Sequence, residues 1–397
     1  MSLEDSRTLS RCGGRIERPA THGAVLVSRS RVIGWVRFGV CGLLLAAIFH
    51  VIFCNEVQLS MPAGDWQSLS RWQQRQRAWI DGPRALWDLS NRVRPVELAV
   101  SFGACGLVIL VGGLRWRQVL RAQGLDLSVA AVLRISLVAQ FFNAFLLGTA
   151  GGDVVKAWYA ARSVPEKKPE AALTVFADRL LGMVALLVFA ELLMLPNLAL
   201  VIRYERHAAV ALLLTGMLIA SGTLILVGFY SDLLQHDGWV PRMVRRLPKG
   251  DSFSRALVAC RQFGHHPGFM TRMALWSLAV NVCVVAAFGA LAHGLGIVLP
   301  DLSVLGATLP GQVTLWYVIP AVVCVAALPV TPAGLGVREH LFVWLLAIPA
   351  LGVKPGAALS LSLLGYTVNL LWSVIGGIVY LVLPDREEIA AAGSAIE

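Results

Sequence analysis

The chain has 397 residues, of which 57% are hydrophobic and only 15% are charged, whereas an ordinary soluble domain has roughly 45–50% apolar and about 25% charged residues. The apolar residues gather in long runs, which argues against a water-soluble enzyme, a disordered chain, a disulfide scaffold and a membrane β-barrel. The net charge of +10 is typical of basic cytoplasmic loops, so we expect no nucleic-acid partner.

The first segment, residues 1–31, is polar and rich in arginine. We expect a disordered cytoplasmic tail and then a retained first span at Phe38–Cys54, because no small-residue cleavage site follows that run. The segment 55–94 contains tryptophans at 66, 72, 79 and 87 as well as six arginines. Since tryptophan is enriched at membrane surfaces, we expect parts of this external segment to lie in the interface.

Further apolar runs occupy most of the remaining chain. They are Leu98–Leu114, Leu127–Leu147, Leu173–Leu195, His207–Tyr230, Met273–Leu299, Ser303–Leu328, Val337–Leu351 and Ala357–Leu383. Runs such as 303–328 meet the length of about 20 residues that a membrane crossing needs. The runs at 127–147 and 337–351 are flanked by glycine-rich turns. The sequence therefore predicts an all-α polytopic membrane helix bundle over 32–384, with about six to eight spans and two glycine-rich broken or re-entrant hairpins.

The placement of lysine and arginine predicts the orientation. The loop 231–272 carries seven basic residues, and further basic groups close the second span and precede the 173–195 run. By the positive-inside rule these segments are cytoplasmic, and both termini are then inside, including a short tail at 385–397. We therefore expect a multi-pass protein of the bacterial cytoplasmic membrane. Besides the loop 231–272, the basic residues on which this orientation depends are Arg115, Arg117, Arg121, Arg162, Lys167 and Lys168.

Two glycine-rich segments resemble each other at an offset of 182 residues. The first runs from Thr149 to Lys156 and the second from Thr331 to Arg338. The same offset relates neighbouring apolar runs, so we interpret 97–196 and 272–383 as repeat-like halves. The first begins with a span running inwards and the second with one running outwards, so the halves are expected to be inverted, as in secondary transporters. The alternative is a pair of ordinary tight turns between helices.

The glycine segments have the chemistry of an anion site. A break in a helix frees backbone N–H groups, and the positive end of the next helix favours phosphate. Lys156 and Arg338 add positive charge about one turn further on. The candidate substrate-binding residues of these segments are Gly151, Gly152, Asp153, Lys156, Gly334, Gly336, Arg338 and Glu339.

Charged and amide side chains also interrupt the apolar runs. A charge at the bilayer centre costs about 2.5–3.5 kcal/mol on insertion scales, so each needs a partner, a wet cavity or a route to the surface. We add Asp178 and Arg179 to the candidate site, with snorkelling as the alternative, and for Arg338 and Glu339 the alternative is a local ion pair. Polar structural positions are Arg134, Asn143, Thr149 and Thr331. Asn143, Asn281 and Asn369 are expected to form hydrogen bonds between helices.

These motifs together resemble the lysylphosphatidylglycerol synthase transmembrane family. The resemblance is carried by Phe141-Phe142-Asn143, Gly151-Gly152-Asp153, Lys156, Asp178-Arg179 and the run from Pro329 to Glu339, and it covers about 95–385. Upstream, Arg115-Trp116-Arg117 and Leu120 also match the family pattern. Leu147 replaces a usual proline and Ala333 a usual glycine. The resemblance implies a flippase-like membrane region. Only 14 residues follow Leu383, so we expect neither an aminoacyl-transferase nor a glycosyltransferase domain in this chain.

The leading hypothesis is a transporter, rather than an enzyme, that moves an amphipathic, phosphate-bearing lipid between leaflets, without a cofactor or a metal. Its partners are then the lipid and enzymes of lipid biosynthesis. A membrane-embedded transferase with a polyprenyl-phosphate donor remains an alternative, with Glu56 or Asp65 as the carboxylate. A third alternative is an accessory subunit of envelope lipid biosynthesis.

Overall fold

The computed structural model describes most of the apolar part of the chain. The chain divides into two units, Met1–Leu43 and Leu44–Glu397, and all described residues belong to the second. The described ranges are 64–91, 93–145, 151–164, 167–230, 268–304, 307–328 and 336–382, with single residues at 46, 50, 53, 54, 57, 58, 61 and 263. The predicted tails, most of the first span and basic loop, and Glu56, Thr149, Thr331 and Gly334 lie outside them.

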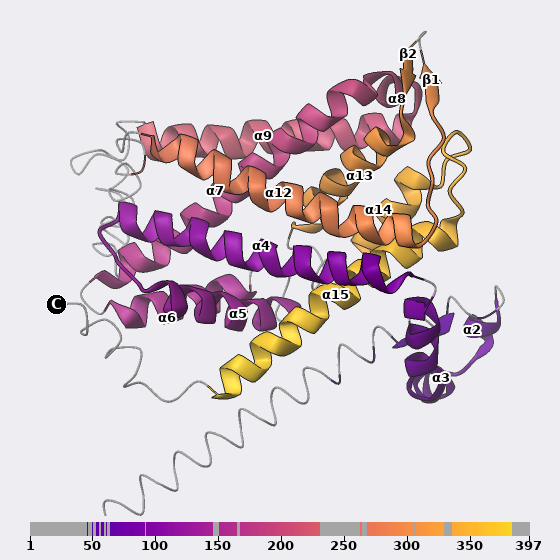
Figure 1. Ribbon diagram of the computed structural model, residues 1–397, viewed down its shortest axis with the longest axis horizontal. Helices are drawn as coiled ribbons and strands as arrows, with labels where there is room; N and C mark the ends of the chain where they lie inside the picture. Colours follow the sequence, from indigo (N-terminus) through magenta and orange to yellow (C-terminus); the bar gives the residue numbers. More distant parts are fainter. Residues whose placement is uncertain are drawn as a thin grey trace, which may run out of the picture. The chain divides into compact units, whose positions relative to one another are not determined.

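Five long helices are apolar enough to cross a membrane, which confirms the prediction of an all-α polytopic bundle (Figure 1). Prolines stand in the first turn of several of them, where a missing backbone N–H costs nothing. The long helices are α4 (Pro95–Ala122), α7 (Lys168–Met194), α9 (Glu205–Tyr230), α12 (Phe269–Gly294) and α15 (Pro355–Val382).

Shorter elements connect and interrupt these helices. Before the spans come α2 (Asp65–Ser68) and α3 (Arg71–Asn91), and η3 (Leu195–Asn197) with α8 (Leu198–Arg203) joins α7 to α9. The glycine-rich regions are flanked by four helices, namely α5 (Val129–Phe145), α6 (Gly151–Ser163), α13 (Gly311–Ala326) and α14 (Val337–Leu346).

One predicted span is wrong. The run 303–328 is not a single helix, because β1 (Leu302–Val304) and β2 (Ala307–Leu309) form an antiparallel pair and only α13 follows. Pro310 caps α13, and its fixed backbone angle favours a helix start there. The next residue, Gly311, lies very close to Leu299. A Cβ on Gly311 would be 2.0 Å from the carbonyl oxygen of Leu299. The chain therefore turns back sharply before it enters the bundle.

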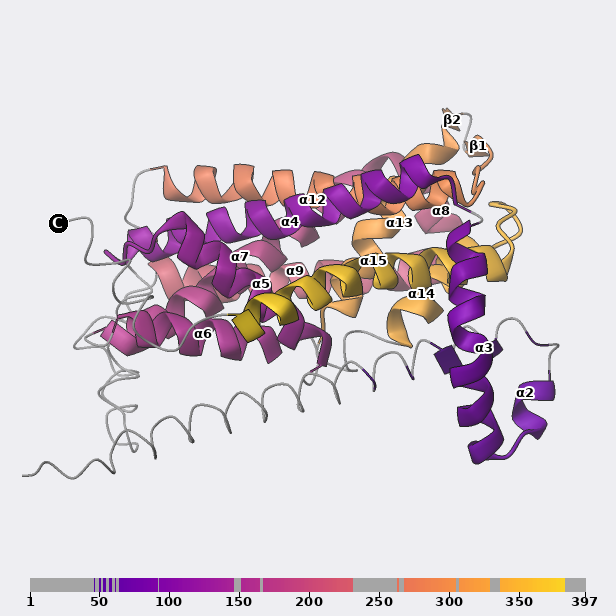
Figure 2. The ribbon, with the colours of Figure 1, turned by 60° about the horizontal axis from the view of Figure 1, so that its bottom comes forward.

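The pairs α5–α6 and α13–α14 form hairpins that enter the bundle from opposite ends (Figure 1). At 1.5 Å per residue, α5 is roughly 25 Å long and α6 roughly 20 Å, short of the hydrocarbon thickness of about 30 Å. In Figures 1 and 2, α4 and α12 run in opposite directions, and so do α7 and α15. This arrangement agrees with the predicted broken hairpins.

The packing partners follow the same pattern in both halves. Helix α4 packs on α12, α5 packs on α15, and α13 packs on α7. Small residues permit the crossing of α5 and α15, because a Cβ on Gly376 would lie 2.0 Å from the carbonyl oxygen of Leu137. At the same crossing, Gln140 donates to Asn369 at 2.8 Å. Such close approach and interhelical hydrogen bonding hold helices together in lipid, where no hydrophobic force acts between them.

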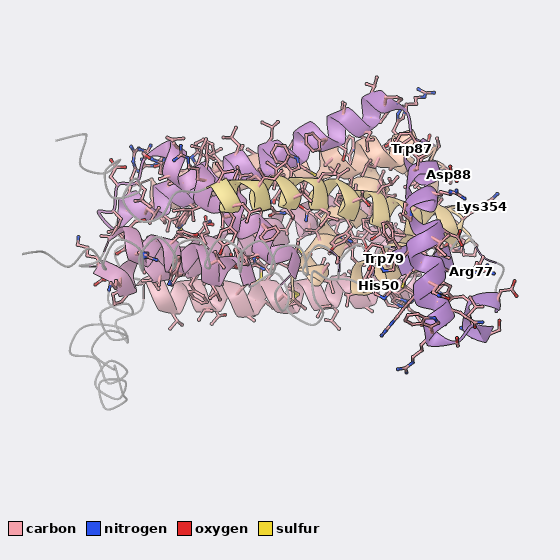
Figure 3. All side chains as sticks on the ribbon, turned by 90° about the horizontal axis from the view of Figure 1, so that it is seen from below. His50, Arg77, Trp79, Trp87, Asp88 and Lys354 are labelled. Carbon is pink, nitrogen blue, oxygen red and sulfur yellow. The ribbon has the colours of Figure 1, made fainter. Side chains whose placement is uncertain are left out.

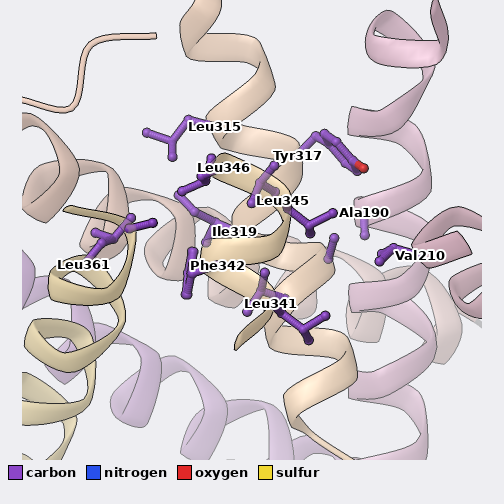
Figure 4. Close-up of a cluster of buried hydrophobic side chains, with 14 of the residues drawn as sticks. Ala190, Val210, Leu315, Tyr317, Ile319, Leu341, Phe342, Leu345, Leu346 and Leu361 are labelled. Carbon is purple, nitrogen blue, oxygen red and sulfur yellow. The ribbon is translucent and has the colours of Figure 1, made fainter. Parts of the chain in front are cut away.

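The largest buried apolar cluster lies where α13 and α14 meet α7, α9 and α15 (Figure 4). Phe342, Leu345 and Leu346 of α14 are fully buried there beside Tyr317 of α13. Tyr317 Oη lies 2.8 Å from Nδ1 of the buried His207. This packing fixes the second hairpin in place and so positions the charged residues at the start of α14.

Candidate functional site

The first hairpin is locked just after its break by a very close contact between α5 and α6. The backbone N–H of Gly152 donates to Oδ1 of Asn143 at 2.8 Å. A Cβ on Gly152 would lie 2.1 Å from the carbonyl oxygen of Ala139, so only glycine permits this approach. The contact sets the direction of α6 and therefore the position of Lys156, one turn further along.

Lys156 belongs to a buried group of charges that we call the first cluster, made of Lys156, Asp178, Arg115 and Ser277. Asp178 of α7 accepts from Arg115 Nε of α4 at 2.9 Å, and its other oxygen lies 3.5 Å from Lys156 Nζ. Arg115 also donates to Ser277 Oγ of α12 at 3.1 Å. The cluster thus joins four helices, and its two cations face one carboxylate.

Neighbouring groups shape the first cluster further. Lys156 Nζ lies 4.2 Å from the ring centroid of the fully buried Trp116, a cation–π arrangement. The indole N–H of Trp116 donates to Thr174 Oγ1 at 3.2 Å. Gly182, one turn beyond Asp178, leaves room for Arg115, because a Cβ there would lie 2.6 Å from its guanidinium nitrogens. The surrounding helices therefore hold both cations in fixed positions.

A second ion pair lies beside the first cluster. Arg179 Nη1 lies 2.9 Å from Asp153 Oδ2, which links α7 to the first turn of α6. These side chains are about a third exposed, so water weakens their attraction. The pair is neutral as a whole and leaves the charge of the first cluster unchanged.

The second hairpin carries its own buried group, the second cluster, made of Arg338, Glu339 and Ser362. Gly336 has φ +84°, a backbone angle that side chains disfavour, and it caps α14. Its N–H donates to Glu339 Oε2 at 2.5 Å. Glu339 Oε1 accepts from Arg338 at 3.0 Å and from Ser362 Oγ of α15 at 3.1 Å, and Arg338 Nε also contacts Ser362.

The two clusters share a plan but differ in charge. In each, a cation near the start of the helix that follows a glycine-rich break is held by a side chain of the next long helix, and that cation lies over an aromatic ring. For Arg338 that ring is Tyr366, at 5.0 Å. The first cluster holds two cations and one carboxylate, so its net charge is positive when all three are ionised. The second holds one of each and is neutral.

The structure brings together part of the predicted site. Lys156 meets Asp178, Asp153 meets Arg179, and Arg338 meets Glu339 as the local ion pair that was the alternative for those two residues. Gly151 is buried at the start of α6. The predicted helix-joining amides do form such bonds, since Asn143, Asn281 and Asn369 each reach a neighbouring helix. Arg134 is exposed on α5, away from either cluster.

Sequence reasoning missed three partners in the clusters. The sequence predicts Arg115 as a cytoplasmic charge and as part of the family resemblance but not as a partner of Asp178, and two full turns of α4 follow it. Ser277 and Ser362 carried no signal, because serine in an apolar helix is common. Among the described residues, no group of three His, Cys, Asp or Glu side chains is placed to hold a metal ion.

Comparison with known proteins places the chain in a family. No curated protein matches the sequence. The family model described as the lysylphosphatidylglycerol synthase transmembrane region matches residues 78–377, a range that contains both clusters and nearly all of the five long helices. Because this match covers well over half of the sequence, the chain belongs to the family of the lysylphosphatidylglycerol synthase transmembrane region.

Proposed function

We propose that this integral membrane protein translocates an amphipathic, phosphate-bearing lipid between the two leaflets. The observation that carries the proposal is the pair of hairpins that enter from opposite ends, each with a buried cation near the start of the helix that follows its glycine-rich break. Buried charges inside a membrane domain are costly, and they mark substrate or ion pathways in transporters. Broken helices in inverted halves are the usual setting for such a pathway.

Phosphate is the headgroup chemistry that suits the first cluster best. Its two cations are offset by one carboxylate, which leaves an excess positive charge for an anion to neutralise. Arginine and lysine are also the side chains that bind phosphate most often. Asp178 then has a positioning role, because it holds Arg115 and Lys156 towards each other in the absence of the anion.

The helix starts are occupied by the protein's own side chains. Asn143 accepts from Gly152, and Glu339 accepts from Gly336. A phosphate that binds to the N–H of Gly152 or Gly336 therefore has to displace the oxygen that this N–H already holds. In the proposal, displacement of Glu339 also releases Arg338, so binding and rearrangement of the second hairpin are coupled.

The proposal includes an orientation in the bacterial cytoplasmic membrane with both termini in the cytoplasm. Arg117 and Arg121 lie in the last turns of α4, and Lys167 and Lys168 lie just before and at the start of α7. Positive-inside bias assigns that end to the cytoplasm. The first hairpin then opens towards the cytoplasm and the second towards the outside, as alternating access requires.

Leaflet exchange of a fluorescent phospholipid tests the proposal. The protein is reconstituted into vesicles with nitrobenzoxadiazole-labelled phosphatidylglycerol, and dithionite bleaches only the outer leaflet. We expect accelerated exchange for the unmodified protein and its loss in Lys156→Ala and Arg338→Ala. Lys168→Ala and Lys354→Ala remove exposed cations near the base of each hairpin and serve as matched controls that retain exchange.

Two outcomes contradict the proposal. Exchange that is unaffected by either cluster variant shows that the clusters do not serve translocation. Absence of exchange, together with transferase product that disappears in Asp65→Asn, supports the membrane transferase instead. Asp65 lies in the first turn of α2, on an element separate from both hairpins, so this variant leaves the clusters intact.

A further inference from the structure

Helix α3 has a composition that excludes a membrane crossing. It is 21 residues long, but it contains four arginines, two aspartates and Pro83, and it is not among the helices apolar enough to span. Figures 2 and 3 show α3 running across the long helices rather than alongside them. It directly precedes α4 and contacts α15, so it lies where those two spans begin.

One face of α3 packs against the protein. Ala78 is fully buried, and a Cβ on Gly82 would lie 2.3 Å from Cβ of Phe53. Trp79 is held at the edge of this face by His50, whose Nδ1 accepts from its indole N–H at 3.1 Å (Figure 3). These contacts fix how α3 is rotated about its axis, and therefore which residues point outwards.

The adjacent face carries four largely exposed apolar or aromatic side chains, with the exposed Gln76 between them. Trp72 is 65% exposed, Trp79 47%, Ile80 67% and Trp87 68%. Trp72 and Trp79 are seven residues apart, as are Ile80 and Trp87, so at 100° per residue they form one stripe about 100° wide. Tryptophan is enriched at the level of the lipid headgroups, where its ring is apolar and its N–H remains wet.

Four of the six charged residues of α3 lie on the far side of the aromatic stripe from the buried face. Arg77 and Arg84, seven residues apart, lie at the edge of the aromatic stripe, and Asp81 and Asp88 lie beyond them. The other two charged residues, Arg71 and Arg75, are exposed and lie on the side of Ala78 and Gly82 at 100° per residue. The order from the stripe to the arginines at its edge and then to the aspartates matches the layers of a membrane surface, because acyl chains come first, then phosphates that attract arginine, and then water.

We propose that α3 is an in-plane membrane anchor, whose stripe of Trp72, Trp79, Ile80 and Trp87 is buried in the headgroup layer of the leaflet where α4 begins. The occupant of the stripe is lipid rather than a protein partner. Two features favour lipid: the stripe lies at the end of spans whose outer faces are themselves apolar, and its arginine edge complements phosphate. The anchor is independent of the translocation proposed above.

Site-specific photocrosslinking tests this assignment in the full chain. Benzoylphenylalanine replaces Trp72, Trp79 or Trp87, or as matched controls Arg77, Asp81 or Asp88, and each variant is reconstituted into phosphatidylethanolamine–phosphatidylglycerol vesicles. After irradiation, mass spectrometry measures the lipid adduct. We expect several-fold more adduct at the tryptophan positions. Equal yields on both sides of the helix, or adducts with protein at the tryptophan positions, overturn the proposal.

A second measurement avoids the unnatural residue. Phospholipids brominated near the carbonyl group quench only tryptophans at that shallow depth. Replacing Trp72, Trp79 and Trp87 by phenylalanine is expected to lower the quenched fraction of total fluorescence. An unchanged quenched fraction also overturns the proposal, because the three indoles then lie outside the interface.

Discussion

Removal of the carboxylate at Asp178 is the sharpest perturbation that the structure offers. Asp178 is buried and pairs with both Arg115 and Lys156. Asp178→Asn keeps the shape of the side chain but leaves two buried cations without a counter-charge. Breaking a buried pair in this way costs about 3–5 kcal/mol. We expect a loss of that order in the free energy of unfolding.

Asp126→Asn is the matched control for this loss. Asp126 also accepts from two arginines, Arg117 and Arg121, but its side chain is 70% exposed. Surface pairs contribute about 0–1 kcal/mol. The same chemical change should therefore have little effect at this position, and the difference between the two variants measures the contribution of burial.

A double-mutant cycle separates charge from packing. In the unmodified protein, Lys156→Met removes a favourable attraction. In the Asp178→Asn background it removes an uncompensated charge and should recover part of the loss, with a coupling energy of about 1–3 kcal/mol. Unfolding is followed by circular dichroism during denaturant titration in mixed micelles. Our reasoning fails if Asp178→Asn falls within the range of Asp126→Asn, or if Lys156→Met has the same effect in both backgrounds.

Three further predictions concern positions where the structure leaves no room or no spare partner. Gly152→Ala forces a Cβ against a backbone carbonyl of α5 and should cost about 1–3 kcal/mol in the same titration, whereas Gly112→Ala meets no atom within 4 Å and should have no comparable cost. Gly182→Ala should displace the guanidinium of Arg115 and therefore slow leaflet exchange in the dithionite assay. An unchanged exchange rate argues against a role for Arg115 in translocation. Ser362→Ala deprives the buried ion pair of the second cluster of a shared hydroxyl, so a cost of about 1–3 kcal/mol is expected, and a stability equal to that of the unmodified protein contradicts the described hydrogen bonds.

The long helices and the breaks between them could be predicted from the sequence because both depend on local composition. A bilayer requires about 20 apolar residues for each crossing, and glycine is less favourable than alanine in a helix by about 1 kcal/mol, so a segment with several glycines and a threonine or proline favours a break. Helices α5 and α13 begin at Val129 and Gly311, which are 182 residues apart, the same offset as between the two glycine-rich segments. Composition alone wrongly predicted a single span at 303–328, because the backbone turns at Pro310 although the residues on both sides are mostly apolar.

The partners of the candidate site could not be predicted in the same way. Arg115 and Asp178 are 63 positions apart and Arg115 and Ser277 are 162 apart, and their meeting depends on which helix faces pack together. All-round apolar helices carry little periodicity from which such faces can be identified. Sequence patterns therefore located Lys156 and Arg338 with their carboxylates Asp178 and Glu339. They did not identify the further members of the clusters, which are Arg115, Ser277 and Ser362.

The central claim is that the two hairpins enter the membrane from opposite sides, each bringing one buried cation. Its most direct test is the sidedness of Lys167→Cys and Lys354→Cys, two exposed positions at the bases of the first and second hairpins. With the native cysteines replaced, a membrane-impermeant maleimide is applied to spheroplasts and to inverted vesicles. We expect Cys at 354 to react only in spheroplasts and Cys at 167 only in inverted vesicles. Reaction of both positions from the same side contradicts the inverted arrangement.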